Sequence, residues 1–370
     1  MTKGTLSMQA VKVRSSNLVK YSRKYRTFQG IPGLAVSCSG ILWATWYSGG
    51  ETECEKNFVL VCSSNDDGRT WSEPQVVIDP PETVRAFDPV LWIDPLDRLW
   101  LFWAQSDGEN SIFDGVGGVW GICKTAADNL AMDWTEPRRI ANGIMMNKPT
   151  VLSSGEWAMP TAVWNDICGK VPEELQNEKK SNVVISTDNG ESFIYRGGAD
   201  IPDRCFDEHM VVELADGRLW MLVRTNYGIG QSFSCDDGEN WSSGENSGIR
   251  GPNSRFFIRR LKSGRLLLVN HNSADNEECK RSKLTAWLSD DDGKSWYGEL
   301  LLDSREGVSY PDGQEDANGN IYIIYDHQRY KAGDILLARF REEDVIEGKC
   351  SSPGSFLQRL VDSSGGVKQD

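Results

Sequence analysis

The three histidines of the chain follow apolar, strand-like runs, and each could act as a base. His209 adjoins Glu208, His271 ends an apolar run, and His327 follows Tyr325-Asp326. A neutral imidazole accepts a proton readily near neutral pH, because its pKa lies close to that value. A lone histidine is more often structural, but three at such positions leave both a catalytic and a structural role open.

The elements that must position such residues are indicated by a turn motif, Ser-x-Asp-x-Gly-x-x-aromatic, that occurs four times. Asp and Ser hydrogen-bond their own backbone in a tight turn, Gly accepts a positive φ, and the aromatic packs beneath the turn. Each copy follows an apolar run, so each predicts a strand, a turn and a second strand. The copies span residues 64–71, 186–193, 234–241 and 289–296.

The spacing of this turn motif predicts a repeated unit of about 50 residues. The aspartates stand at 66, 188, 236 and 291, so the intervals are 122, 48 and 55 residues. The long interval indicates one repeat with a degraded turn, for which Lys124–Asp128 before Trp134 is the candidate. Six further strand pairs of a second kind are interspersed with the motifs. The chain is therefore expected to be all-β, folded as a six-bladed β-propeller.

The repeats leave little room for other structure. Only residues 173–180 and 342–346 look helical, and no Pro/Ser-rich linker divides the chain. We expect residues 1–370 to form a single β-propeller domain, with blades from about 25 to 350. Residues 1–20 and 352–370 are expected to be loose ends.

The repeated turn lies at the outer edge of a blade, so function is expected on the other hairpins, whose ends reach the centre. Residues 206–224 contain Glu208 and end in Arg224, Arg281 precedes the last turn motif, and Tyr310 opens the segment Tyr-Pro-Asp-Gly. With the turn motifs, these segments resemble the sialidase (neuraminidase) superfamily over nearly the whole chain. The resemblance implies a six-bladed propeller in which Tyr310 is the nucleophile, Glu208 takes its proton, and Arg224 and Arg281 bind a substrate carboxylate.

The chemistry of an acidic sugar agrees with these residue types. A sialic acid glycoside reacts through an oxocarbenium-like transition state beside its own carboxylate, which would repel a carboxylate nucleophile, so a neutral tyrosine is preferred. Tyrosine has an unperturbed pKa of about 10 and needs a neighbouring base such as Glu208. Arginine suits a carboxylate because its planar fork donates two parallel hydrogen bonds.

Two parts of the family pattern differ in this chain. The family's first arginine lies in a Phe/Tyr-Arg-Ile-Pro motif, but residues 28–32 read Phe-Gln-Gly-Ile-Pro, so Gly30 replaces the arginine. Arg26 is close by in sequence but is expected to point elsewhere. The acid/base aspartate is not evident. An early loop offers Glu51, Glu53 and Glu55, and the two candidates taken forward are Glu53 of this loop and Asp88, before Pro.

Further polar residues are candidates for the pocket. His209 is a possible catalytic base, and the possible substrate-binding residues are Lys148, Arg255, His271 and His327. For Lys148 a packed hairpin, and for Arg255 a surface position, explains the residue about as well.

Three functions remain open from the sequence. The leading one is an exo-acting glycoside hydrolase that releases a terminal, acidic sugar. The second is a polysaccharide lyase that removes a proton beside a uronate carboxylate, with His209 or His271 as base and Tyr310 nearby. The third is a non-catalytic carbohydrate-binding propeller, which the missing arginine favours and the Tyr310–Glu208 pair disfavours.

The composition limits the partners. The chain has 370 residues and a net charge of −14, so it is a poor general binder of nucleic acid or anionic membranes. It has no apolar run of signal-peptide or membrane-spanning length, and its nine cysteines include no CxxC pair. We expect a carbohydrate substrate, no metal or other cofactor and a cytoplasmic location, with secretion by a leaderless route and the oligomeric state left open.

Overall fold

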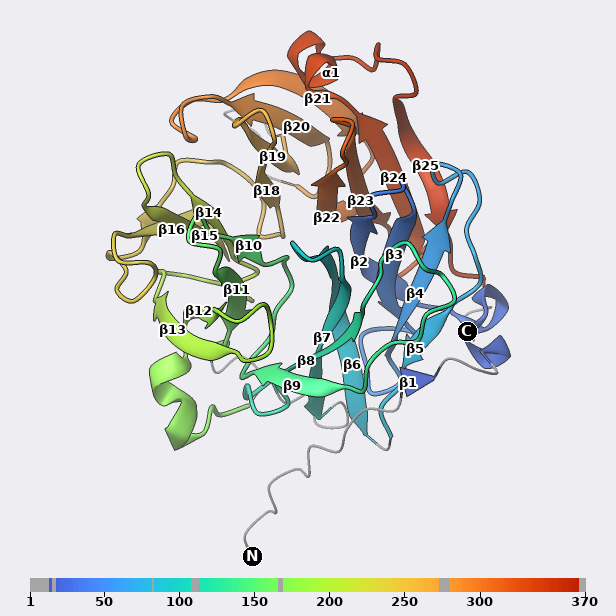
Figure 1. Cartoon of the computed structure of the whole chain (residues 1–370), viewed down its shortest axis with the longest axis horizontal. Helices are drawn as coiled ribbons and strands as arrows, with labels where there is room; N and C mark the ends of the chain where they lie inside the picture. The colour runs from blue at the N-terminus through green and yellow to red at the C-terminus, as the bar shows by residue number, and fades with distance from the viewer. Residues whose placement is uncertain are drawn as a thin grey trace, which may run out of the picture.

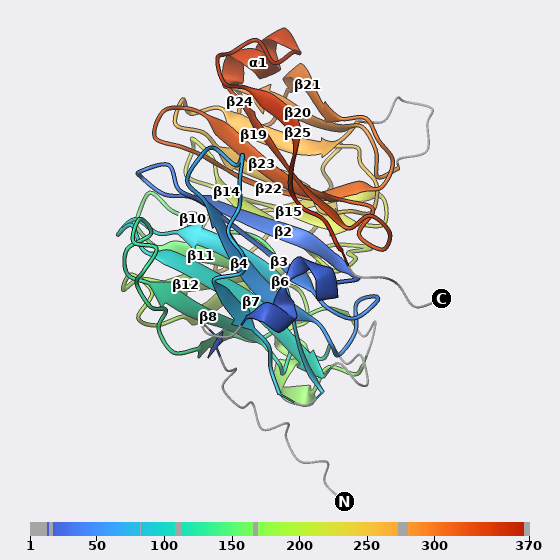
Figure 2. The same ribbon diagram turned by 90° about the vertical axis from the view of Figure 1, so that its right-hand side faces the viewer.

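The computed structural model describes residues 13–14, 18–81, 83–107, 113–165, 169–272 and 280–365. Its strands form six antiparallel sheets arranged around a common centre (Figures 1 and 2). Within the described ranges, helix is confined to η1 (Val19–Tyr21), η2 (Arg23–Tyr25), η3 (Glu173–Glu178) and α1 (Glu342–Glu347). The expected six-bladed β-propeller is confirmed.

Each sheet is one blade, and its first strand lies nearest the centre, where β2 contacts both β6 and β22. The first three blades are β2 (Gln29–Val36), β3 (Leu42–Ser48), β4 (Phe58–Ser64), β5 (Val76–Ile78) with the edge strand β1 (Val13–Arg14); β6 (Val84–Ile93), β7 (Leu99–Asp107), β8 (Val119–Lys124), β9 (Arg138–Ala141); and β10 (Thr150–Val151), β11 (Trp157–Ala162), β12 (Ser181–Ser186), β13 (Ile194–Ala199). The last three are β14 (Met210–Glu213), β15 (Leu219–Thr225), β16 (Gly228–Ser234), β17 (Glu245–Asn246); β18 (Phe257–Arg260), β19 (Leu266–His271), β20 (Leu284–Ser289), β21 (Tyr297–Asp303); and β22 (Val308–Glu315), β23 (Ile321–His327), β24 (Asp334–Phe340), β25 (Phe356–Asp362).

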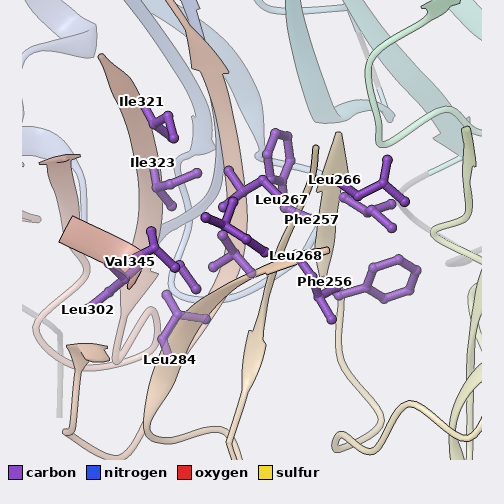
Figure 3. Packing of buried hydrophobic residues seen from close by; sticks show 14 of the residues in the cluster. Phe256, Phe257, Leu266, Leu267, Leu268, Leu284, Leu302, Ile321, Ile323 and Val345 are labelled. Atoms are coloured by element: carbon purple, nitrogen blue, oxygen red, sulfur yellow. The ribbon is translucent and has the colours of Figure 1, made fainter. Parts of the chain in front are cut away.

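Apolar side chains fill the space between neighbouring blades. Figure 3 shows part of one such cluster, in which Phe257 and Leu268 of the fifth blade lie with Ile321 and Ile323 of the sixth and Val345 of α1. Burial of these surfaces is the main favourable term for the fold, at roughly 25 cal/mol per Å². No helix among the described residues is long and apolar enough to cross a membrane.

The repeated turns join the third and fourth strands of four blades, and their hydrogen bonds explain the motif. Ser234 Oγ accepts from the backbone N–H of Gly238 at 2.9 Å and donates to Asp236 at 2.8 Å. Asp236 accepts from the backbone N–H of Asn240 at 2.9 Å, and this hydrogen bond is the largest cause of the lowered pKa of Asp236. In the second blade, residues 125–137 occupy the same place between β8 and β9 without the motif, which accounts for the long interval.

Replacing Ser234 by alanine should destabilise the fold measurably. Ser234 is 1% exposed, and without its hydroxyl the buried N–H of Gly238 loses its acceptor, a loss that costs about 1–3 kcal/mol. The free energy of unfolding from urea titration would show the change. The exposed Ser243 provides the matched control, and an equal loss in Ser243→Ala would contradict a specific role for the motif.

The C-terminal segment corrects one expectation. Residues 356–362, expected to be part of a loose end, form β25, the outermost strand of the last blade, which pairs with β24. Asp362 accepts from Arg26 Nη2 at 2.7 Å, so Arg26 points away from the centre, as expected, and ties the last blade to the first. Residues 1–12, 15–17 and 366–370 lie outside the described part of the chain.

Candidate active site

Three of the first strands carry the same irregularity near the centre. β2, β6 and β22 each shift register at an X-Pro dipeptide. The residue before each proline has a positive φ, which is 54° at Ile31, 49° at Asp88 and 57° at Tyr310. Proline cannot donate to the ladder and is tolerated within a strand at a bulge. All three residues line one central cavity, so the bulges place these side chains in it.

Glu208 is presented by a strained segment before β14. Phe206, Asp207 and Glu208 have φ values of 59°, 54° and 43°. Such strain persists only where surrounding contacts hold it. Arg204 Nη1 donates to both carboxylate oxygens of the buried Asp207 at 2.8 Å, and Ser181 Oγ donates at 2.5 Å. These bonds anchor the segment that points Glu208 into the cavity.

The central cavity has a volume of about 390 Å³ and combines aromatic with ionisable side chains. Two other hollows, of about 470 and 460 Å³, lie near the third to fifth blades, and neither brings a tyrosine and a carboxylate together. A pocket of this size that gathers many titratable groups is the natural place for chemistry. The polar and aromatic lining residues are Glu53, Arg85, Phe87, Asp88, Phe113, Trp164, Phe206, Glu208, Arg224, Arg281, Tyr310, Arg329 and Tyr330.

Three buried groups are directly hydrogen-bonded in this cavity. Tyr310 Oη donates to Glu208 Oε1 at 2.9 Å. Arg224 Nη1 donates to Glu208 Oε1 at 2.5 Å and to Tyr310 Oη at 2.9 Å. Burial, and then the charge of Glu208, raise the pKa of Tyr310, although Arg224 acts in the opposite direction. The resting phenol therefore keeps its proton, and that proton already points at a carboxylate.

Two further arginines flank the same phenol. The guanidinium of Arg329 lies 4.1 Å, and that of Arg281 5.4 Å, from the centroid of the Tyr310 ring. Arg281 Nη2 also donates to the backbone oxygen of Asn253 at 3.0 Å. The structure thus brings Arg224 and Arg281 together with Tyr310, and adds Arg329, which the sequence did not indicate.

The two acid/base candidates both line the cavity but differ in charge state. Burial raises the pKa of Asp88 to about 8, although Arg85 acts against it. Burial would also raise the pKa of Glu53, but Arg329 and Arg85, 3.6 and 3.7 Å away, outweigh it and lower the pKa. Near neutral pH, Asp88 therefore holds a proton that it can donate, whereas Glu53 is a carboxylate.

Lys148 and Arg255 lie outside the cavity lining, inside the propeller. Lys148 Nζ donates to Asp312 Oδ2, and Arg255 Nη2 lies 3.4 Å from Asp312 Oδ1. Asp312 also accepts from the backbone N–H of Leu34 at 2.8 Å. The two cations neutralise a buried carboxylate, because an unpaired one would be costly there.

The three histidines are also placed outside the lining of the central cavity. His209 Nε2 lies 2.7 Å from the carbonyl oxygen of Asn182, and His271 Nε2 lies 2.9 Å from that of Val308. Burial lowers the pKa of both imidazoles, that of His271 to about 4. His327 Nδ1 contacts Asp334 at 3.0 Å. Their strand-end positions therefore serve contacts with neighbouring backbone and side chains.

Sequence reasoning missed Arg329, Tyr330 and Arg85. Arg85 lies three residues before Asp88, and Arg329 and Tyr330 follow β23 in a loop without a motif. The recurring X-Pro dipeptide was the available signal for cavity-lining positions. Within the described ranges, no group of three or more His, Cys, Asp or Glu side chains could hold a metal ion.

Comparisons with known proteins agree with this fold. Residues 40–323 match the family model of the BNR repeat-like domain. Among solved structures, a Hadza microbial sialidase is 17% identical with a TM-score of 0.67, over 88% of this chain and 67% of that chain. The intramolecular trans-sialidase from Ruminococcus gnavus, in complex with oseltamivir carboxylate, is 15% identical with a TM-score of 0.64, over 90% and 98%.

A protein of unknown function from Dyadobacter fermentans is 16% identical with a TM-score of 0.62, over 85% of this chain and 95% of that one. No curated protein matches the chain in sequence. At these identities the structural likeness shows the fold alone, whereas the family model covers most of the chain. The chain belongs to the BNR repeat-like family, as a divergent member with the six-bladed propeller of the sialidases.

Proposed function

We propose that the protein is an exo-acting glycoside hydrolase that releases a terminal sugar bearing a carboxylate. The observation that carries the proposal is the buried hydrogen-bonded group of Tyr310, Glu208 and Arg224. A tyrosine beside a carboxylate is the arrangement of a nucleophile with its base. A cavity of about 390 Å³ suits the end of a glycan. Structural neighbours named as sialidases support the same class of reaction.

The proposed reaction proceeds by two displacements. Tyr310 Oη attacks the anomeric carbon as its proton passes to Glu208, and the bond from that carbon to the leaving oxygen breaks. Asp88 gives its proton to the leaving oxygen. A water that loses a proton to the Asp88 carboxylate then displaces the sugar, and Glu208 returns its proton to Tyr310. One water is consumed and the anomeric configuration is retained.

Two arginines of the cavity would bind the carboxylate of the acidic sugar. Arg224 and Arg281 lie beside the phenol, where a carboxylate on the reacting sugar would accept their charge-assisted hydrogen bonds. Arg224 also stabilises the phenolate character that develops as Glu208 takes the proton. Without these cations, the site would have no charge-based preference for an acidic sugar over a neutral one.

The test is a panel of fluorogenic glycosides with the purified protein. The panel contains an N-acetylneuraminic acid α-glycoside, a glucuronide and a galactoside. We expect turnover of an acidic sugar, with the retained anomer seen first by proton NMR. An unsaturated uronate product would instead indicate a lyase, and binding without turnover across the panel would indicate a carbohydrate-binding propeller.

Replacing Asp88 by asparagine should reveal the general acid. In the wild-type protein, kcat/KM should fall as pH rises through about 8, because the protonated form of Asp88 is lost. In Asp88→Asn this alkaline limb of the pH profile should disappear, and activity should fall by about 10²- to 10⁴-fold on alkyl glycosides. The loss should be much smaller on aryl glycosides, whose leaving groups need no proton.

The control for Asp88→Asn is Glu53→Gln, which should keep the alkaline limb. The thermal stability of Asp88→Asn at two pH values tests the raised pKa of Asp88 independently of activity.

Because the folded pKa of Asp88 lies above its unfolded value of about 3.9, its contribution to stability falls as pH rises between the two values. Asp88→Asn should therefore gain thermal stability relative to wild type at pH 8 but not at pH 4. An alkaline limb that survives in Asp88→Asn would rule this residue out as the acid.

A further inference from the structure

Gly30 and Arg329 occupy one space in the cavity wall. A Cβ at position 30 would lie 3.0 Å from Arg329 Cβ, 3.3 Å from Arg329 Cδ and 3.0 Å from Asp326 Oδ2. Contacts of this length are tighter than nine in ten real Cβ contacts, and two of the three are to the aliphatic stem of the arginine. A side chain at position 30 would therefore require Arg329 or Asp326 to shift by a few tenths of an ångström. Glycine at position 30 leaves room for Arg329 in its present place.

Arg329 is held firmly over the reacting phenol. Its guanidinium lies 4.1 Å from the Tyr310 ring centroid, and Nη2 donates to Ser309 Oγ at 2.9 Å. Asp326 Oδ2 is 3.4 Å from Nη2 and accepts from the backbone N–H of Ile31 at 2.9 Å. Only 6% of the arginine is exposed. A cation fixed by several partners is preorganised for a ligand.

The guanidinium groups around the phenol outnumber the ionised carboxylates that pair with them. Four guanidinium groups, those of Arg85, Arg224, Arg281 and Arg329, line the cavity. Their acidic partners are Glu53, Glu208 and Asp326, whereas the raised pKa of Asp88 keeps that group neutral near pH 7. Buried charge that is not matched within the protein favours binding of an opposite charge.

We propose that Arg329, delivered from the loop after β23, takes the place of the arginine that position 30 lacks and binds the substrate carboxylate with Arg224 and Arg281. The inference rests on the proposed function, since it concerns the acidic group of the same sugar. Arg224 Nη1, 2.9 Å from Tyr310 Oη, and Arg329 both lie at the nucleophile. The carboxylate that they bind therefore belongs next to the anomeric carbon. Asp326 is a positioning residue for Arg329.

The test compares binding of a carboxylic acid with that of its methyl ester by calorimetry. The probes are 2-deoxy-2,3-dehydro-N-acetylneuraminic acid and its methyl ester, whose shapes differ little and whose charges differ by one. Wild type should prefer the acid. Arg329→Gln and Arg329→Gly should weaken binding of the acid by about 30-fold or more. Binding of the ester should change much less.

A second variant keeps the test informative if Arg329 variants fold poorly. Because two of the three close contacts are to Arg329, a glycine at 329 relieves them and leaves only the contact with Asp326 Oδ2. Gly30→Arg with Arg329→Gly should recover part of the preference for the acid, whereas Gly30→Arg alone should lose it. Recovery in the double variant requires that the two positions serve one carboxylate.

The outcomes separate this inference from the proposed function. An acid preference that survives loss of Arg329, no recovery in the double variant, or no binding of the acid by wild type would each overturn the inference. Arg329-dependent binding of the acid without turnover of any glycoside would support the inference and contradict the hydrolase. Turnover of an acidic glycoside that depends on Tyr310 but not on Arg329 would support the hydrolase alone.

Discussion

Tyr310→Phe should lower kcat/KM on an acidic glycoside by about 10³-fold or more, with little change in KM or in thermal stability. The substitution removes one oxygen and leaves the ring against the guanidiniums of Arg329 and Arg281. Glu208 keeps its hydrogen bond from Arg224, so the pocket retains its charges. What is lost is the atom that attacks the anomeric carbon.

A second variant, Glu208→Gln, tests the base in the same mechanism. An amide holds the same place but cannot take the proton of Tyr310, so attack by a neutral phenol should be slower by about 10²- to 10⁴-fold. Mass spectrometry of wild type with a 3-fluoro acidic glycosyl fluoride should show one sugar attached to Tyr310, and none in Tyr310→Phe. Full activity in Tyr310→Phe would mean that another group reacts, and would remove the basis of the mechanism.

The repeated turn predicts the fold because its chemistry is local. Ser234, Asp236 and Gly238 bond within one short loop, so their spacing alone predicts the turn and, by repetition, the blades. The pairing of Glu208 with Tyr310 could be expected only through the family resemblance. The two residues are separated by 102 positions and meet because blades four and six face the same centre.

What escaped prediction depends on contacts between distant segments. Arg329 lines the cavity close against position 30, which has no Cβ and lies almost a whole propeller away in sequence. His209 and His271 stand at strand ends as expected, yet they contact the carbonyl oxygens of Asn182 and Val308 outside the cavity. Neither effect has a signal in the spacing of residues.

The strand β25 was not predicted from the sequence for the same reason. Its sequence, FLQRLVD, lies between Ser/Gly-rich stretches that are typical of a loose tail. The strand is stabilised by β24 and by the pairing of Asp362 with Arg26, which are 336 residues apart. A single sequence offers no local sign of such a partner.

Asp362→Ala should therefore be among the most destabilising single substitutions in the protein. Arg26 is 2% exposed, and Asp362 Oδ2 accepts its Nη2 at 2.7 Å. Removing the acid leaves a buried guanidinium without its carboxylate, which costs about 3–5 kcal/mol. Urea titration followed by tryptophan fluorescence measures the free energy of unfolding. Leu360→Ala is the matched control on the same strand, because that side chain is 48% exposed and should change stability little.

Removing residues 352–370 should have a still larger effect, since the last blade then loses β25 as well as the Asp362 charge. The edge of β24 would be left with unpaired backbone groups, and the first and last blades would lose a contact that closes the ring. We expect insoluble or unfolded protein at 37 °C, whereas Leu360→Ala within the intact strand should change the thermal midpoint little. A truncated chain that folds with normal stability would show that the ring closes through the first strands at the centre rather than through the rim.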